Sequence, residues 1–543
     1  MGWDGSQRIP KILAVPEEER TPFVDGLLEI CLLQQEQIQS LKDEIARLKG
    51  LKPKPQIKPS ALENKSDRDK SKRERKKRRG SSKRRKTREL EIHATVEIWP
   101  DNIPEGSRFK GYQDFTVQDI VIRPHNTRYR LARFETPAGE QMVGMLPAEL
   151  AGGHFGPMLH SFVLYQYYHA HVTQPLILEQ LLEFGIDISS GQVNRIIIED
   201  KERYHAEKDD ILRVGLEVSR YIHVDDTGAR HQGRNGYCTH VGNELFAWFV
   251  STGSKSRINF LKLLRAGRTD YVLNAEALEY MRGQKLPKVQ IEKLAAHEGK
   301  VSSNKQEWEA VLKELRITGA RHVRIATEGA LLGSVIENDF NPELAIISDD
   351  AGQFNVLLHG LCWIHAERTI NKLVGINDGQ REALSSVRSQ IWDFYDELKA
   401  YKESPDEEKK SKIEARFDEL FTQKTCFVSL NLALGRIHKN KSELLLVLER
   451  PDISLQNNLS ERDIREYVKK RKISGSTRSD EGRRCRDTFI SLKKTSRKLD
   501  ISFWDYINDR VFGRNRIPPL ADLIRQQARA SPAGLGGVPA AAR

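Results

Sequence analysis

The sequence predicts a multidomain protein with a mixed α/β core. With 543 residues, the chain is several times longer than a typical single domain and can bury at least two separate cores. From about residue 220 onwards, apolar strand-like runs alternate with helical spacing. Two of these runs end in paired acids, Asp225 with Asp226 and Asp349 with Asp350. Acids that directly follow a buried strand are either solvated or hold something positive, so the second alternative requires a search for partners.

Composition excludes several classes of protein. The hydrophobic share is 38% and no run of about 18 apolar residues occurs, so we expect no membrane segment. The first residues lack the basic flank and apolar block of a secretory signal. The cysteines are few, odd in number and scattered, which favours a reduced cytosol over a disulfide scaffold. They are Cys31, Cys238, Cys362, Cys426 and Cys485.

The positive charge is concentrated in one segment, residues 65–88, which we call the basic arm. It holds 15 Lys or Arg against 3 acids, a surplus equal to the net charge of +12 of the whole chain. Such a block buries nothing, so we expect a disordered tether that binds polyanions by counterion release. A solvated linker or a nuclear import signal is the alternative. The cations we expect to contact DNA are Lys76, Lys77, Arg78, Arg79, Arg84 and Arg85.

A heptad pattern precedes the basic arm and predicts a coiled-coil helix over about residues 24–49. One set of positions repeats every seven residues at Val24, Cys31, Ile38 and Ile45, and a second at Leu27, Gln34, Leu41 and Leu48. Mainly β-branched residues in the first set and Leu in the second favour a parallel dimer, with Gln34 fixing the register. The partner is then a second copy, in a homodimer or higher oligomer. An amphipathic helix packed on its own chain is the alternative.

Two small units are predicted after the basic arm. Residues 91–147 contain the short apolar runs "EIHATVEIW", "TVQDIVIR" and "RYRLARFETP" between Pro and Gly residues, which predicts a small antiparallel β unit. Residues 157–200 change to helical spacing, with "FGIDISSGQ" as the turn between two helices. This pattern is typical of a helix-turn-helix, and also occurs in other small helical bundles.

The core begins with three extended segments, "SRYIHVDD", "GYCTHVG" and "LFAWFVST", which predict a meander. A basic helix, "SKSRINFLKLL", follows, and then the second apolar run, "PELAIISDDAGQFNV". Two strands with carboxylates at their exits, separated by a meander and a helix, are the device by which an RNase H-like fold places two acids side by side. Solvated strand ends often carry Asp as well, so the two pairs alone leave both interpretations open.

A third acid, Glu461, lies near the start of a predicted helix in "SLQNNLSERDIREYVKKRK". Ser460 or Asn458 can cap this helix, which stabilises a carboxylate in its first turn. The same helix carries a set of cations that suits a phosphate backbone better than a purely structural role. An ordinary solvated basic helix is the alternative. The cations are Arg462, Arg465, Lys469, Lys470 and Lys472.

Together these residues resemble the insertion-sequence transposases of the IS66 family, over about residues 90–512. Three blocks carry the resemblance: "HVDDTG", "SDDAGQF" followed by "LCWIHAER", and "NNLSERDIREYVKKRK". The family has an RNase H-like catalytic domain with an Asp, Asp, Glu triad. The resemblance therefore implies that Asp225, Asp349 and Glu461 are the catalytic residues and metal ligands, with Asp226 and Asp350 as their neighbours.

The resemblance also implies cofactors and partners. Two Mg²⁺ ions, with Mn²⁺ as an alternative, would be held by the three acids, because hard cations take oxygen ligands. The partners would be double-stranded DNA, both element ends and target, together with small accessory transposition proteins. The location would be the bacterial cytoplasm, in association with the nucleoid.

One departure from the family concerns zinc. Many relatives carry a Cys-x-x-Cys unit in the region that corresponds to residues 93–140, where this chain has no cysteine. We therefore expect a β unit without metal. Cys362 and His365 lie one turn apart and could form half a zinc site, but no second pair is near in sequence, and packing is the favoured interpretation.

These predictions divide the chain into eight segments and leave three functions open. The leading function is a transposase that cleaves and joins DNA strands. The alternatives are an RNase H-like nuclease or resolvase that only hydrolyses DNA, and a catalytically silent DNA-binding protein derived from a transposase. The segments are the coiled-coil segment 1–50, the linker 51–92, the β unit 93–150, the helix-turn-helix-like unit 151–206, the core 207–376, a helical insertion 377–447, the final Glu helix 448–512 and the tail 513–543.

Overall fold

The computed structural model describes residues 24, 27, 30, 31, 34, 91–147, 150, 153–337, 341 and 343–530. It divides into two compact units, 1–122 and 123–543, each of which is described by itself. The basic arm, with its six candidate DNA-binding cations, and the last 13 residues, 531–543, lie outside the described residues.

In the first unit, the predicted coiled-coil segment is helical at every described position. These positions are Val24, Leu27, Ile30, Cys31 and Gln34, and the rest of the predicted seam lies outside the described residues. Leu27 and Ile30 are 46% and 52% exposed, so two large apolar side chains of this helix are available to a partner. These five positions are helical, and the coiled coil itself stays a prediction.

The small β unit differs from its prediction. The runs "EIHATVEIW" and "TVQDIVIR" contain no strand, and their apolar side chains are exposed. Only the third run contributes a strand, β1 (Arg133–Glu135), which pairs with β2 (Gln141–Val143) in an antiparallel hairpin. Strand-forming side chains need a layer to pack against, and nothing in the described part of the chain covers these runs.

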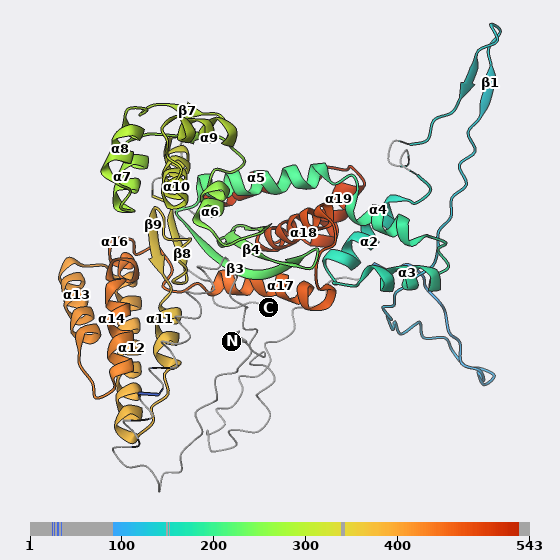
Figure 1. The fold of residues 1–543 in the computed structure, drawn as a ribbon. Coiled ribbons are helices and arrows are strands. Elements are labelled where there is room, and N and C mark those ends of the chain that lie inside the picture. Colours follow the sequence, from blue (N-terminus) through green and yellow to red (C-terminus); the bar gives the residue numbers. More distant parts are fainter. Residues whose placement is uncertain are drawn as a thin grey trace, which may run out of the picture. The chain divides into compact units, whose positions relative to one another are not determined.

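A five-stranded mixed sheet forms the centre of the second unit (Figure 1). The strand order is β5-β4-β3-β8-β9, in which the first three strands are antiparallel and β8 and β9 run parallel to β3. The predicted meander is confirmed. The strands are β3 (Tyr221–His231), β4 (Arg234–Gly242), β5 (Ala247–Thr252), β8 (Ala345–Ser348) and β9 (Leu358–Leu361).

Side chains of β3 alternate between the two faces of this sheet. Ile222 and Val224 point into the larger core, to which α5 (Glu202–Val218) and α10 (Ala320–Glu337) contribute. Tyr221 belongs to a second core on the opposite face, together with α11 (Trp363–Asn371) and the helices that follow it. The helix α17 (Asn458–Ser474) packs on β3 and β4, and its Ile464 and Tyr467 bury Phe249 of β5.

The free edge of β5 is covered by α18 (Asp480–Lys498). The amides of Ala247, Phe249 and Ser251 point outward from this edge. They donate to side-chain oxygens of Thr495, Ser491 and Asp487 at 3.1, 2.9 and 2.6 Å. Residues four apart on a helix thus satisfy amides two apart on a strand, and this pairing closes an edge that would otherwise be open to another strand.

Two groups of elements are inserted into the core. The predicted basic helix is α6 (Arg257–Leu264), capped by Ser256. Between it and α10 lie β6 (Tyr271–Val272), α7 (Ala275–Gly283), α8 (Lys288–Ala295), β7 (Val301–Ser302) and α9 (Lys305–Glu314). Between α11 and α17 lie α12 (Asp378–Glu403), α13 (Glu407–Thr422), α14 (Val428–Lys439), α15 (Lys441–Leu444) and α16 (Leu446–Glu449).

The remaining helices flank the core. The predicted pair around "FGIDISSGQ" is α3 (Gln174–Glu183) and α4 (Ser190–Ile198), and the hydroxyl of Ser189 caps the second helix by accepting from the amide of Gln192. Before them lies α2 (Pro157–Tyr168), which packs on α19 (Phe503–Val511), while α20 (Leu520–Ala530) packs on α5. A search of the described helices finds none with the length and apolar character needed to cross a bilayer.

Candidate active site

The first acidic pair lies within a strand and not at its exit. Asp225 and Asp226 are the fifth and sixth residues of β3, which continues to His231, so the predicted strand end is wrong. The strand continues because β4 pairs with it as far as His231, whereas β8 pairs only with Tyr221 to His223. The acids therefore stand where the parallel neighbour ends and the antiparallel neighbour goes on.

Asp226 is fully engaged by protein groups. The Thr239 hydroxyl donates to its Oδ1 at 2.5 Å, the Gln353 amide donates to its Oδ2 at 2.8 Å, and the Lys255 ammonium lies 3.9 Å from Oδ2. Its side chain is 3% exposed. Because its side chain lies on the face of β3 opposite that of Asp225, Asp226 is a structural acid with its partners already in place.

Asp225 and Asp349 come together through strand register. The parallel ladder ends where His223 pairs with Ile347, and Asp225 and Asp349 each follow two residues later. The negative charge of Asp349 acts on Asp225, so the two acids are neighbours. Among the residues that the structure describes, none donates a hydrogen bond to the buried Oδ1 atom of Asp349. A buried carboxylate oxygen without a partner is costly, so this atom is a candidate to bind a ligand.

Glu461 reaches the same edge from α17. Its Oε1 atom accepts from Arg368 at 3.0 Å and lies 3.6 Å from His365, both on α11, and Arg465 lies 3.9 Å from its Oε2. The predicted caps, Ser460 and Asn458, are wrong. The N-cap residue is Asn457, and its side chain does not cap the helix. Ser460 instead binds the buried His240 at 2.6 Å.

The three acids interact electrostatically. Burial, followed by the negative charges of Asp349, Asp226 and Glu461, raises the pKa of Asp225 to about 7, against the opposing effect of the Asp226 amide that donates to it at 2.7 Å. Carboxylates that repel one another disfavour their charged forms, and a cation among them removes this cost.

The residue types at this site suit a hard cation, although they are not arranged as a metal site. In the part of the chain that the structure describes, no group of three or more His, Cys, Asp or Glu side chains stands in an arrangement that could hold a metal ion. Glu461 is paired with Arg368 in this arrangement. The oxygen-only donor set, the buried Oδ1 of Asp349 and the raised pKa of Asp225 have the chemistry that a cation such as Mg²⁺ requires.

Beyond Glu461, α17 presents a basic outer face. Four of its cations are exposed and spaced three, four and three residues apart, which places them on one side of the helix. They are Arg462, Arg465, Lys469 and Lys472.

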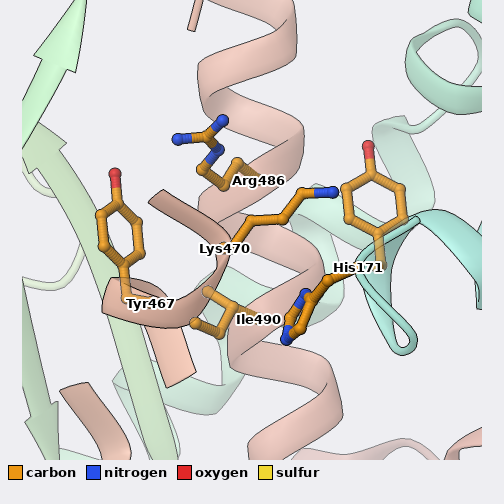
Figure 2. A pocket seen from close by; sticks show the side chains of 6 residues that line it. His171, Tyr467, Lys470, Arg486 and Ile490 are labelled. Carbon is orange, nitrogen blue, oxygen red and sulfur yellow. The ribbon is translucent and has the colours of Figure 1, made fainter. Parts of the chain in front are cut away.

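Lys470 differs from these four cations, because it is buried and its ammonium donates to the Tyr167 carbonyl at 2.9 Å. Figure 2 shows it among His171, Tyr467 and Arg486, which line a small pocket with it. Burial, with the nearby charges of Arg486 and Lys493, lowers the pKa of Lys470 to about 7. This lysine attaches α17 to α2 and is not a surface contact.

Several residues of the site were not identified from the sequence. His365 and Arg368 were seen only as part of a motif, although their spacing of three on the helix that follows β9 places them on one face of that helix. Cys362 is buried, as packing requires, and its Sγ accepts from the amide of Asn457 at 3.1 Å. Asp350, the other neighbouring acid, is stabilised by a hydrogen bond with Asn440 that opposes the raising of its pKa by burial.

Comparison with known proteins adds two findings. Residues 347–484 match the family described as "Transposase IS66 family", a range that contains Asp349 and Glu461 but not Asp225. The chain is also 41% identical, over 321 residues, to "Uncharacterized protein y4jO" of Sinorhizobium fredii (strain NBRC 101917 / NGR234). That alignment covers 59% of this chain and the whole of the relative.

Proposed function

This chain belongs to the IS66 family of transposases, and from that premise we propose that it binds the ends of an insertion sequence and cleaves and joins DNA strands through Asp225, Asp349 and Glu461. The observation that supports the proposal is electrostatic: the negative charges of Asp349, which follows β8, and of Glu461 on α17 raise the pKa of Asp225 on β3. Such crowding is expected of a site that waits for a cation.

The sheet supports an RNase H-like core. Three antiparallel strands are followed by two parallel ones, with Asp225 inside the central strand β3 and Asp349 directly after its parallel neighbour β8, and this order is compatible with such a core. Because β3 and β8 are neighbours in the mixed sheet, Asp225 and Asp349 can act together although they are far apart in the sequence. Glu461 then needs only one helix that crosses the same face.

The chemistry requires a dense array of oxygen ligands. Mg²⁺, or Mn²⁺ in its place, would supply the charge that holds the attacking and leaving oxygens of a phosphodiester in line. Asp225 and Asp349 would hold the cation from adjacent strands, and Glu461 would complete the site from α17. Arg368 and His365 hold Glu461 in the absence of the cation, and on release Arg368 becomes available to a phosphate.

DNA binding is proposed for three surfaces. The outer face of α17 carries Arg462, Arg465, Lys469 and Lys472, next to the acids. The pair α3 and α4 supplies a helix-turn-helix-like element for the element ends. The basic arm, residues 65–88, supplies contacts to phosphates that do not depend on sequence.

A homodimer is proposed through the heptad seam, because the seam residues Leu27 and Cys31 are exposed in the single chain. Replacing Ile38 and Leu41 by Lys places two charges at interface positions, so we expect the full chain to sediment as a monomer. Replacing Glu36 and Gln39 by Lys, at heptad positions outside the predicted seam, serves as the control and should leave the dimer intact. An unmodified chain that is already monomeric contradicts the proposal.

The test of the proposed function uses the DNA that flanks the gene. A plasmid that carries those flanks should be cut at the element ends in the presence of Mg²⁺, and the released 3′ ends should be joined to a second plasmid. Cutting without joining favours the nuclease alternative. Binding of the flanks without cutting favours the silent DNA-binding protein.

A further inference from the structure

Asn457 connects two of the acids directly. It is fully buried at the start of α17, with no exposed surface. Its side-chain amide donates to the carbonyl of Val224, the residue before Asp225, at 2.8 Å. The backbone carbonyl of Asn457 accepts from the backbone amide of Glu461 at 3.2 Å, as the first turn of a helix requires. One residue thus fixes the backbone beside Asp225 and the backbone of Glu461.

Cys362 extends the connection to the third acid. The amide of Asn457 donates to the Sγ of Cys362 at 3.1 Å, and the amide of Cys362 donates to the carbonyl of Ser348, the residue before Asp349, at 3.0 Å. Cys362 is also the N-cap residue of α11, the helix that carries His365 and Arg368. The chain of hydrogen bonds therefore runs from Val224 through Asn457 and Cys362 to Ser348.

We propose that Asn457, acting through Cys362, is the positioning residue that sets the spacing of Asp225, Asp349 and Glu461; this inference rests on the proposed function of the three acids. Each acid is adjacent to, or directly bonded by, a backbone group in this chain of hydrogen bonds. Metal ligands need such support, because a carboxylate displaced by a fraction of an ångström loses its ligand geometry.

The chemistry of the position selects an amide. Val224 offers a carbonyl, so the atom beside it must be the donor Nδ2, and Oδ1 then accepts from His223 Nδ1 at 2.9 Å. With Nδ2 donating to Val224, Oδ1 is the atom that faces the ring of His223, so Nδ1 of His223 is the donor in this bond. Asp at this position would place a carboxylate against a carbonyl, and Ser would be too short to reach both partners.

The experiment compares Asn457→Ala with Asn458→Ala in the full-length chain. Asn458 is the adjacent asparagine, and its side chain donates only to Gln456, so it is the matched control. Two quantities are measured: the Kd for Mn²⁺ without DNA, by electron paramagnetic resonance of the free ion, and the rate of DNA cleavage. For Asn457→Ala we expect a Kd at least tenfold weaker and a rate at least tenfold lower, with unchanged affinity for DNA. Asn458→Ala should stay within twofold of the unmodified chain in both.

A folded Asn457→Ala protein that matches the unmodified chain in both quantities overturns the positioning role. If that variant does not fold, Cys362→Val and Cys362→Ser decide, because Ser keeps an acceptor for the Asn457 amide and Val does not. Equal Mn²⁺ affinity of these two variants overturns it as well. Asp225→Asn is measured alongside. If Asp225→Asn binds Mn²⁺ and cleaves DNA normally, the proposed function itself has failed. If Asp225→Asn loses Mn²⁺ binding and cleavage while Asn457→Ala keeps both, only the role of Asn457 is contradicted.

Discussion

Asp225 and Asp226 are adjacent in the sequence and have opposite surroundings in the structure. Among the residues that the structure describes, Asp226 has a hydroxyl, an amide and a cation as partners, whereas Asp225 has the adjacent backbone amide and the negative charges of other acids. Alternation along a strand is sufficient to separate them. The sequence predicts that acids gather here, and the resemblance implies that Asp225 is the catalytic one. The role of Asp226 could not be predicted, because its partner Gln353 lies more than a hundred residues away in the chain.

The raised pKa of Asp225 makes a prediction about stability. Folding raises the pKa of Asp225 from 3.8 to about 7, so the folded state binds this proton more tightly than the unfolded state does. The protonated acid therefore stabilises the fold at low pH, and this stabilisation is lost as pH rises from about 4 to 7. In EDTA at pH 8, Asp225→Asn should therefore raise the free energy of unfolding by about 2 kcal/mol, after allowance for its partial exposure. The Tm of both proteins, measured between pH 4 and 8, should converge at the acidic end.

The partners of the three acids could not be predicted from the chain. Arg368, which holds Glu461, comes from a helix 93 residues earlier, and Asn457 reaches Val224 across 233 residues. Local spacing carries no information about such pairs, because the fold alone brings them together. The motif "LCWIHAER" contained the His and the Arg, but their target could not be identified without the position of α17.

At the scale of elements, α17 has two different faces. Its outer face carries exposed cations, and its inner face carries Glu466, which lies 2.9 Å from His171 and pairs with the buried Lys493 of α18. Hydrogen bonds from His171 and Lys493 hold the pKa of Glu466 well below its usual range. Because Lys493 also donates to the carbonyl of His169 at 3.0 Å, Glu466 and Lys493 together attach the end of α2 to the helix that carries Glu461.

Glu466→Gln tests this attachment. The substitution leaves the ammonium of Lys493, which is 1% exposed, without its counter-ion, so we expect a loss of about 3 kcal/mol of stability at pH 7. A depressed acid pKa contributes stability that is present above the usual pKa and disappears as pH falls, so the difference from the unmodified chain should shrink toward pH 3. Thermal unfolding at several pH values measures it. Lys469→Ala, which removes an exposed partner 3.6 Å from Glu466, is the control and should change Tm little.

Elements that are marked by caps or turn residues in the sequence were predicted correctly. Strands that need another layer of the protein to pack against were predicted where none forms. Ser189 and Ser256 begin α4 and α6 as side-chain caps, and the meander follows its turn residues. The runs before residue 124 have the composition of strands, but their side chains remain exposed and no ladder forms. Strand propensity describes a half-buried surface, so it fails where the other half of that surface is missing.

At the scale of the whole molecule, charge and catalysis occupy different parts of the chain. The surplus of +12 lies in the basic arm, and the three acids lie in residues 225–461. Contacts to phosphates position a protein on DNA without specifying a sequence, so the arm should add affinity for any DNA. Specificity for element ends must then come from elsewhere in the chain.

Deletion of residues 65–88 tests this division. We expect weaker binding to every DNA sequence alike, and a shallower dependence of log K on log salt, by roughly 0.9 for each phosphate contact removed. Replacing the arm by a segment of the same length with Gln in place of Lys and Arg separates charge from tether length. Binding isotherms at several salt concentrations measure the slope, and a slope that does not change would show that the arm is only a linker.

The measurement that tests the central claim most directly compares Asp225→Asn with Asp226→Asn in Mg²⁺-dependent cleavage and joining of the element ends. Asn keeps the shape of Asp and loses the charge that a cation needs. The account predicts that Asp225→Asn abolishes both steps while it folds and binds DNA, that Asp349→Asn and Glu461→Gln do the same, and that Asp226→Asn retains most of the activity. Full activity of Asp225→Asn, or early melting with loss of DNA binding, would contradict the account, because the acids on β3 would then be structural.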